Sequence, residues 1–583
     1  MSPYTLRPTV RIRGRDEACW RGWPAVARQL AEMAHDARVV TIECYTGVFA
    51  DEIIQHLASA LDAEVLRAQD ALRPPVEVEA LVAPNLTDDP VFGRLSTLDL
   101  DAFFDPAGLD GLRQQVEASG RRVLVVGAGA TLVHPGDLLV YADMPRWEHQ
   151  LRYRRGEASN LGADNADARW GHQYKRGFFV DWRVLDRHKR SLLARWDAVL
   201  DTTQPGDPRL VTGDAYREAL RQTASQPFSP VPFFDPGPWG GQWMRRVCGL
   251  DDRDDADGRQ QPPNYAWCFN GVPEENSLLL QFGDVVVETP AQNLVYAEPD
   301  ALLGHRVRAR FGEEFPIRFD FLDTMGGGNL SLQVHPLADY AREHFGLTYT
   351  QDESYYLMDA EPGAVVYLGL KDDVDPEAMA RDLDAAQAGE ISFPAEQYAA
   401  TWPVQAHDHV SIPAGTVHCS GAGSMVLEIS ATPYIFTFKL WDWDRLGLDG
   451  RPRPIHLDRG LANIQWDRTE AWTREHLLRP PRALAEGRGW REEQTGLHEL
   501  EFIETRRLWC TESVPRDTQG TVHVLCLVEG CEAVIESPSG AFAPARIGYA
   551  EVVIVPAGVG AYTVGPAGEA EAPLAILTAF VRA

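Results

Sequence analysis

Residues 331–336 read Ser331-Leu332-Gln333-Val334-His335-Pro336, and this stretch decides how the second half of the chain is interpreted. Alternate side chains of an extended strand share a face, so Gln333 and His335 point to the same side of a sheet. Glu353 and His418 follow further along the chain. Two imidazoles, a carboxylate and an amide oxygen suit zinc or another divalent metal, with positions left for water or substrate. The sequence therefore predicts a catalytic metal site rather than a closed structural one.

Several ordered motifs in this region resemble class I mannose-6-phosphate isomerase. They are the run Gln-x-His-Pro, a Glu eighteen residues after that His, and Pro-Ala-Gly-Thr-x-His at residues 413–418. Residues 423–429 are similar to the family's Val-Leu-Glu-Ile segment. The run Trp441-Asp442-Trp443-Asp444-Arg445, followed by Asp449-Gly450-Arg451-Pro452-Arg453, resembles its Tyr-Asp-Tyr-Asp-Arg motif and glycine turn. The resemblance covers residues 230 to 583.

This resemblance implies tandem cupin (jelly-roll) domains around one zinc ion per chain, with Gln333, His335, Glu353 and His418 as ligands. It also implies an aldose–ketose isomerase that interconverts mannose 6-phosphate and fructose 6-phosphate through a metal-stabilised enediolate. The family's candidate base lies in the Val-Leu-Glu-Ile segment and corresponds to Glu428 here. An alternative role for Glu428 is to orient a ligand imidazole.

The phosphate of such a substrate needs positive charge and hydroxyl donors. The family pattern points to Ser331 and to an Arg whose position is taken by Lys439, with Arg445 as a further contributor. We therefore expect Glu428 and Lys439 to be catalytic, and Ser331, Lys439 and Arg445 to bind substrate. Lys keeps the charge but lacks the planar guanidinium that grips phosphate at two points.

A second departure from the family is the pair Gln351-Asp352, which stands where the family has Lys-Thr. Another positive charge is therefore missing beside the expected site. Two alternatives to the isomerase stay open on these grounds: a non-catalytic sensor that binds a sugar phosphate, and an isomerase or epimerase of another sugar.

Composition sets the broad class of the protein. A chain of 583 residues is long enough for three or four domains. The net charge of -30, from 55 basic and 85 acidic residues, repels nucleic acid and anionic membrane surfaces. The expected partner is thus a small sugar phosphate held by locally placed cations, with no nucleic acid and no membrane. No apolar run approaches the ~20 residues of a membrane span, and no signal peptide is apparent, so we expect a cytoplasmic protein with reduced cysteines.

The first 225 residues are expected to form an α/β domain with a parallel sheet. Apolar strand-like runs alternate with helical stretches there, at 38–44, 50–66, 111–119 and 123–126. The region resembles a uridine-kinase-type P-loop domain at the level of the fold. The sequence does not set the oligomeric state.

The phosphate-binding chemistry of a P-loop is absent from this region. The glycine, lysine and hydroxyl positions of the loop are taken by Glu43, Val48, Phe49 and Ala50. We therefore predict a degenerate kinase-like domain without phosphoryl transfer. Basic clusters with aromatic neighbours at 146–155 and 175–190 are either a pocket for a phosphorylated metabolite or ordinary packing.

The remaining boundaries follow from composition and motif positions. Residues 226–238 hold five prolines and form the expected linker. The metal-binding cupin domain should cover 239–485, with a small helical insertion at 376–389. Residues 486–583 read as a second cupin that is metal-free, because Val559-Gly560-Ala561-Tyr562 replaces the run that carries His418.

Overall fold

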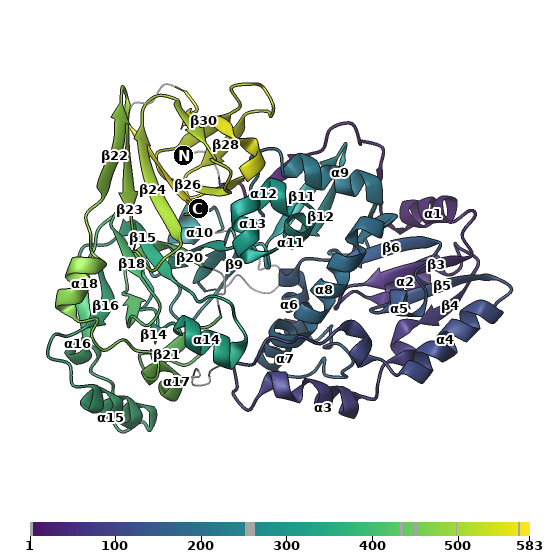
Figure 1. The fold of residues 1–583 in the computed structure, drawn as a ribbon, viewed down its shortest axis with the longest axis horizontal. Helices are drawn as coiled ribbons and strands as arrows, with labels where there is room; N and C mark the ends of the chain where they lie inside the picture. The colour runs from purple at the N-terminus through teal and green to yellow at the C-terminus, as the bar shows by residue number, and fades with distance from the viewer. Residues whose placement is uncertain are drawn as a thin grey trace. The chain divides into compact units, whose positions relative to one another are not determined.

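The computed structural model describes residues 4–250, 263–431, 435–447, 450, 453, 455–496, 498–568 and 572–582. The chain is multidomain and folds into two compact units (Figure 1). The first, called the β unit here, comprises Met1–Pro8, Ala224–Pro273 and Pro299–Ala583. The second, the α/β unit, comprises Thr9–Thr223 and Glu274–Glu298.

The α/β unit is built on a seven-stranded sheet with the order β2-β8-β7-β6-β3-β5-β4. Neighbours from β7 to β4 are parallel, and β8 and β2 add antiparallel strands at one edge. Every residue of β3 and β6 is buried, as expected for strands covered on both faces. The strands are β2 (Cys19–Arg21), β3 (Val39–Cys44), β4 (Ala63–Arg67), β5 (Arg122–Gly127), β6 (Leu138–Asp143), β7 (Ala198–Asp201) and β8 (Arg209–Thr212).

Helices pack against this sheet around a core that includes Val40, Leu124 and Val140. The helix expected at 50–66 ends at Leu57, because the chain turns through Asp62, with φ of 47°, into strand β4. The α-helices are α1 (Trp23–Met33), α2 (Ala50–Leu57), α3 (Pro75–Leu86), α4 (Pro106–Ala118), α5 (Ala130–Val133), α6 (Arg146–Arg154), α7 (Trp170–Arg176), α8 (Trp182–Leu192) and α9 (Gly213–Thr223).

A segment from the second half of the sequence completes the α/β unit. It contains β11 (Ser277–Phe282), β12 (Val285–Pro290) and α11 (Gln292–Ala297), and β11 pairs in parallel with β1 (Thr9–Arg11). The backbone N–H of Glu288 donates to Asp201 at 2.9 Å, and Asn293 Nδ2 donates to Asp143 at 2.9 Å. Buried carboxylates of the sheet thus receive hydrogen bonds from this segment.

The first half of the β unit contains two antiparallel sheets that contact each other through Glu353 and two histidines. Their orders are β18-β15-β20-β13-β10-β9 and β17-β16-β19-β14-β21. The first sheet uses β9 (Phe233–Asp235), β10 (Trp267–Phe269), β13 (Ile317–Asp323), β15 (Glu353–Ala360), β18 (His409–Ile412) and β20 (Ser424–Ala431). The second uses β14 (Leu332–Val334), β16 (Val365–Leu370), β17 (Ala399–Pro403), β19 (His418–Ser420) and β21 (Phe438–Trp441).

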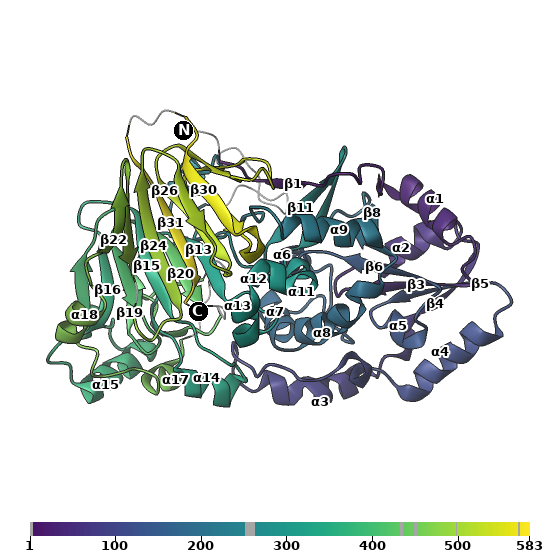
Figure 2. The same ribbon diagram turned by 45° about the horizontal axis from the view of Figure 1, so that its top comes forward.

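The second half of the β unit has another pair of sheets, ordered β22-β23-β24-β31-β26-β29 and β25-β30-β27-β28, around a core that includes Leu508, Leu525 and Ile576. Figure 2 shows β24, β26 and β31 side by side. The strands are β22 (Arg482–Gly487), β23 (Trp490–Thr495), β24 (Ile503–Cys510), β25 (Val514–Asp517), β26 (His523–Glu529), β27 (Glu532–Glu536), β28 (Ala545–Gly548), β29 (Val552–Val555), β30 (Ala561–Pro566) and β31 (Leu574–Val581).

Short helices connect the strands of the β unit. The predicted insertion is present as α15 (Pro376–Gln387), and Asp375 caps it by accepting from the backbone N–H of Glu377 at 3.0 Å. The other helices are α10 (Trp243–Val247), α12 (Pro299–Leu303), α13 (His305–Phe311), α14 (Ala338–Phe345), α16 (Ala395–Tyr398), α17 (Leu457–Leu461) and α18 (Glu470–His476). Within the described residues, no helix has the length and apolar character required to cross a lipid bilayer.

Candidate metal centre

The pleat of one sheet brings three side chains of the candidate site into a row. His418 on β19 lies opposite Gln333 on β14, and Gln333 lies opposite Lys439 on β21. Residues directly opposite each other in a sheet share a face, so the three side chains are neighbours. Glu353, the first residue of β15, contacts this row from the facing sheet. Gln333, His335, Glu353 and His418 are all buried.

The four predicted ligands converge on one point. Glu353 Oε2 lies 3.0 Å from His335 Nε2, and Glu353 Oε1 lies 2.9 Å from His418 Nε2. The Gln333 amide nitrogen is 3.2 Å from His418 Nε2. One ligand atom each from His335, Glu353 and His418 lies within 4.8 Å of the other two.

Both imidazoles present the nitrogen that a metal needs. His335 Nδ1 lies 3.2 Å from the carbonyl oxygen of Phe436, and His418 Nδ1 lies 2.8 Å from that of Thr416. A carbonyl oxygen only accepts, so Nδ1 carries a proton and Nε2, which faces Glu353, is left as the nitrogen that a metal would bind. A half-turn of the Gln333 amide about its terminal bond exchanges its nitrogen for its oxygen. The residues present therefore fit a divalent cation with mixed nitrogen and oxygen ligands.

The pKa values of the two glutamates of the site are shifted in opposite directions. Burial raises the pKa of Glu353, but the contacts with His335 and His418 outweigh burial and bring that pKa well below its usual value. Burial, followed by the charges of Asp320 and Glu353, raises the pKa of Glu428 well above its usual value. Neighbouring carboxyls with opposite shifts suit one group to metal binding and the other to holding a proton.

Glu428 lies on β20 beside a basic and an amide side chain. Its Oε1 is 3.4 Å from Arg318 Nη1 and accepts from Gln351 Nε2 at 3.3 Å. Since backbone carbonyls meet the Nδ1 atoms of His335 and His418, the contacts of the described residues do not support a role for Glu428 in orienting a ligand imidazole.

The expected phosphate-binding residues gather around Asp442. Ser331 Oγ donates to Asp442 Oδ1 at 2.8 Å, and Arg445 Nη2 donates to the same oxygen at 2.7 Å. Arg453 Nη1 donates to Asp442 Oδ2 at 2.8 Å. Burial, followed by the charge of Arg453, lowers the pKa of Lys439 from 10.5 to about 7. This cluster adjoins the metal centre, because Lys439 is the strand partner of Gln333.

Three charged residues of this region were missed by the sequence analysis. Arg318 and Asp320 lie beside Glu428, and Asp320 is its direct strand partner. Their alternation with phenylalanines places both charges on one face of β13, a signal that was available in the sequence. Arg453 contacts Ser331 and Asp442 from the end of the expected glycine turn. The other polar residues of that turn, Asp449 and Arg451, lie outside the described residues.

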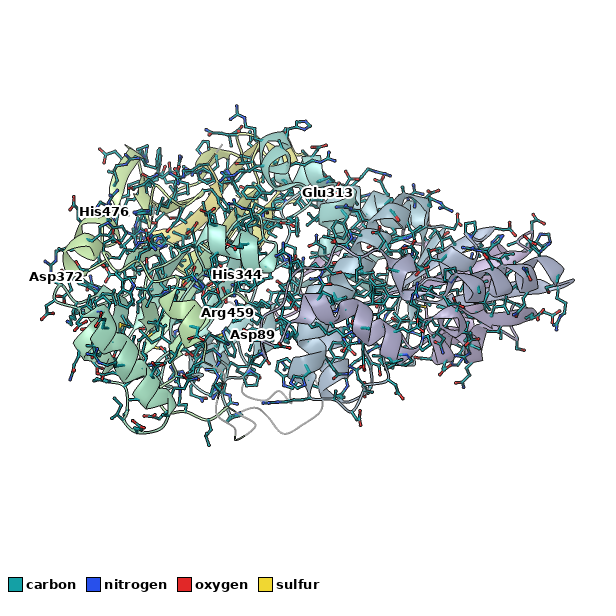
Figure 3. The ribbon with its side chains drawn as sticks, turned by 60° about the horizontal axis from the view of Figure 1, so that its bottom comes forward. Asp89, Glu313, His344, Asp372, Arg459 and His476 are labelled. Atoms are coloured by element: carbon teal, nitrogen blue, oxygen red, sulfur yellow. The ribbon has the colours of Figure 1, made fainter. Side chains whose placement is uncertain are left out.

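A second group of potential ligands consists of His476 at the end of α18, labelled in Figure 3, together with His498 and Glu499. The Nδ1 atom of His498 accepts from the backbone N–H of Leu500 at 3.2 Å, and His476 Nδ1 lies 3.3 Å from a guanidinium nitrogen of Arg479. Each Nδ1 therefore acts as an acceptor, and the proton of the neutral ring stands on Nε2. This tautomer does not suit metal binding through Nε2.

In the α/β unit, the Glu43 carboxylate is hydrogen-bonded to the backbone N–H groups at the start of α5, which could otherwise bind an anion. The carboxylate accepts from the backbone N–H groups of Gly129 at 2.6 Å and Thr131 at 2.8 Å. Several buried cations of the same unit have carboxylate partners, including Lys189 with Asp143 at 2.9 Å. These contacts favour internal packing over a pocket for a phosphorylated metabolite.

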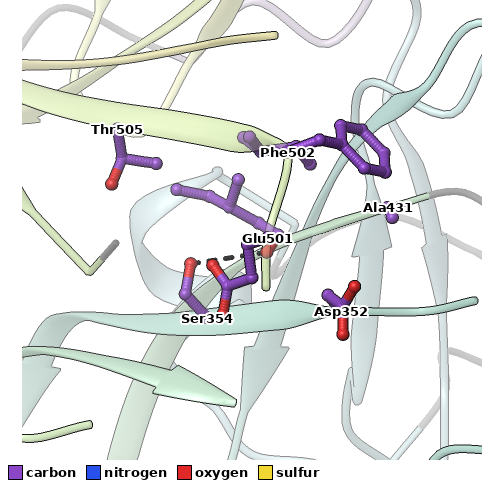
Figure 4. Close-up of a pocket in the computed structure, with 8 residues that line it drawn as sticks. Asp352, Ser354, Ala431, Glu501, Phe502 and Thr505 are labelled. Atoms are coloured by element: carbon purple, nitrogen blue, oxygen red, sulfur yellow. Dashed lines mark hydrogen bonds between the residues drawn. The ribbon is translucent and has the colours of Figure 1, made fainter. Parts of the chain in front are cut away.

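A pocket lies behind the metal centre, on the opposite face of β15 (Figure 4). Asp352, just before β15, and Ser354 on β15 line one side of it, and Glu501, Phe502 and Thr505 line it from the chain at the start of β24. Burial, followed by the charge of Asp352, raises the pKa of Glu501 well above its usual value. The pocket therefore contains a carboxyl group whose ionisation is disfavoured by burial, between the two halves of the β unit.

Comparison with known proteins gives one family match and several relatives. Residues 22–225 match the family described as Domain of unknown function (DUF8485). The chain is 28% identical over 227 residues to Mannose-6-phosphate isomerase of Streptococcus mutans, covering 38% of this chain and 63% of that protein. It is 27% identical over 154 residues to Mannose-6-phosphate isomerase ManA of Bacillus subtilis, covering 26% of this chain and 45% of that protein. The chain thus spans less than two thirds of the length of these relatives.

Among solved structures, the crystal structure of mannose 6-phosphate isomerase from Bacillus subtilis superimposes with a TM-score of 0.48 and 16% sequence identity. The superposition covers 61% of this chain and 99% of that chain.

Proposed function

We propose that the protein is a metal-dependent isomerase that interconverts mannose 6-phosphate and fructose 6-phosphate. The observation that carries this proposal is the convergence of His335, Glu353 and His418, whose ligand atoms lie within 4.8 Å of one another. The similarity to the Streptococcus mutans isomerase supports the substrate class.

In this proposal the paired sheets of the β unit are two cupin jelly rolls, within residues 239–485 and 486–583, with the second metal-free. Residues 226–238, which include strand β9 (Phe233–Asp235) of the first sheet, link them to a degenerate P-loop kinase-like domain at 1–225, to which residues 274–298 also pack. The antiparallel sheet pairs and the parallel sheet of the α/β unit are consistent with this arrangement.

Gln333, His335, Glu353 and His418 would hold one divalent ion, which we propose to be zinc. When bound, such an ion polarises the sugar oxygens as a Lewis acid and stabilises negative charge on them. The Nδ1 hydrogen bonds to Phe436 and Thr416 hold both imidazoles in the orientation that binding needs.

The isomerisation moves one proton between neighbouring carbon atoms of the sugar and a second proton between the oxygens that these carbons carry. Glu428 takes the carbon-bound proton and returns it to the adjacent carbon, because its raised pKa lets the carboxyl retain a proton between the two steps. Arg318 and Gln351 hold this carboxyl in place through contacts of 3.4 and 3.3 Å. Lys439, Ser331 and Arg445 bind the phosphate group and fix the orientation of the sugar.

Metal analysis and an assay coupled to fructose 6-phosphate formation test the proposal together. Gln333→Ala and His335→Ala should lower metal content and reduce turnover of mannose 6-phosphate by at least about 100-fold. His476→Ala is the matched control, since it removes a histidine outside the site and should change neither quantity. Equal metal content in the wild type and both site variants would remove the basis of the proposal.

The sensor alternative is favoured by one observation. Gln351 stands where the resembled family has a lysine, and its amide contacts two carboxylates of the site. Metal-replete protein that binds mannose 6-phosphate without forming fructose 6-phosphate would identify a sensor. Turnover of an unphosphorylated sugar in a substrate panel would identify the other alternative.

A further inference from the structure

Gln351 is a buried amide placed between the two glutamates of the site, with only 3% of its surface exposed. Its Nε2 donates to Glu353 Oε2 at 2.9 Å and lies 3.3 Å from Glu428 Oε1. Both contacts are made by the NH2 group, so the nitrogen side of the amide, and not its oxygen, faces the two carboxyl groups. The orientation of the Gln351 amide is therefore fixed by its surroundings.

The other arm of this amide is left without a partner. Gln351 Oε1 is buried and accepts no hydrogen bond from any described residue. An unpaired buried carbonyl destabilises a protein, and such a group beside a catalytic centre calls for a functional reason. The same amide contacts both Glu353 and Glu428 through its nitrogen.

Resting on the function proposed above, we propose that Gln351 Oε1 accepts a hydrogen bond from a hydroxyl group of the sugar and makes Gln351 a specificity-determining residue. The side chains that contact this amide are the carboxyls of Glu353 and Glu428, and neither supplies a positive charge for an anion. A neutral hydroxyl donor is compatible with this setting.

This chemistry defines the substrate class more closely. The reacting end of the substrate must be a neutral polyhydroxyl chain, and its anionic phosphate must lie toward Lys439 and Arg445. A lysine at position 351 would only donate, so the amide reverses the hydrogen-bonding polarity that the resembled family has there.

Two variants separate the acceptor from the donor of this amide. Gln351→Lys retains donors for Glu353 and Glu428 but removes the acceptor, and Gln351→Met removes both. Gln397→Met is the matched control at an exposed glutamine. The probe is sorbitol 6-phosphate, which carries the hydroxyl groups and phosphate of the sugar but has no carbonyl group to react.

Calorimetric titration of metal-replete protein with this probe gives the test. Both site variants should bind it about 5- to 10-fold more weakly than the wild type, as expected for the loss of one neutral hydrogen bond, with unchanged metal content. The control should bind as the wild type does.

Wild-type affinity for the probe in Gln351→Met would overturn the inference. A loss of affinity accompanied by a loss of metal would also overturn it, because the residue would then only support Glu353. Because the probe does not react, the isomerase proposal is tested separately by turnover of mannose 6-phosphate. Wild-type protein that binds the probe without such turnover would refute the isomerase and leave the role of Gln351 standing.

Discussion

Replacing Lys439 by arginine should change how substrate binding depends on pH. Burial and the nearby Arg453 lower the pKa of Lys439 to about 7, so its charge is present below pH 7 and is lost as the pH rises. If the phosphate binds only the charged form, the apparent dissociation constant rises about fivefold from pH 7 to 8 and about fiftyfold from pH 7 to 9. An arginine keeps its charge throughout this range.

The assay is the KM for mannose 6-phosphate at pH 7, 8 and 9, above the second phosphate pKa of about 6, so that the charge of the substrate stays nearly constant. We expect a rising KM in the wild type, a nearly flat profile in Lys439→Arg, and a high, flat KM in Lys439→Gln. Parallel profiles for the lysine and arginine proteins would refute the reasoning, since a common slope would have to come from another group.

Other predictions concern stability. Lys189→Met leaves the buried carboxylate of Asp143 without its cation and should lower the free energy of unfolding by about 3–5 kcal/mol. Adding Asp143→Asn should recover part of this loss, and urea unfolding measures both variants. A double variant less stable than Lys189→Met alone would contradict the argument. Because the pKa of Glu501 is raised in the folded protein, its ionisation opposes folding, so the wild type should lose stability as the pH rises above the unfolded value near 4.5. Glu501→Gln should reduce that loss in thermal unfolding at pH 5–8, and an unchanged slope would exclude Glu501 as its source. Gly241→Ala should be destabilising because its Cβ would collide with a carboxylate oxygen, while Gly111→Ala, which meets nothing within 4 Å in a helix, should be neutral or stabilising in the same measurement.

The candidate site could be predicted because its geometry is encoded locally. Residue alternation predicted that Gln333 and His335 share one side of the chain, and the ordered motifs added Glu353 and His418. The structure places all four together, although their roles as ligands remain a prediction. The missed contacts of Arg453 depend on a turn rather than on a strand period, so no simple pattern reports them.

The set of strands that builds the α/β unit was not predictable in the same way. Strands β11 and β12 are apolar runs like their neighbours in sequence, and nothing local indicates that β11 pairs with β1, more than 260 residues away. Pairing between distant strands depends on packing that local propensity does not contain. The prediction of a helical stretch as far as residue 66 failed for a related reason. A leucine at position 66 is compatible with a helix or a strand, and only its pairing with β5 makes it a strand residue.

The return of residues 274–298 to the α/β unit has a consequence for synthesis of the protein. During translation, the first 223 residues emerge before the hairpin that pairs with β1 and the amide that binds Asp143. The ribosome must add about another 75 residues before this unit can close. Nascent chains of intermediate length should therefore depend on chaperones and be sensitive to proteases until Glu298 has left the exit tunnel.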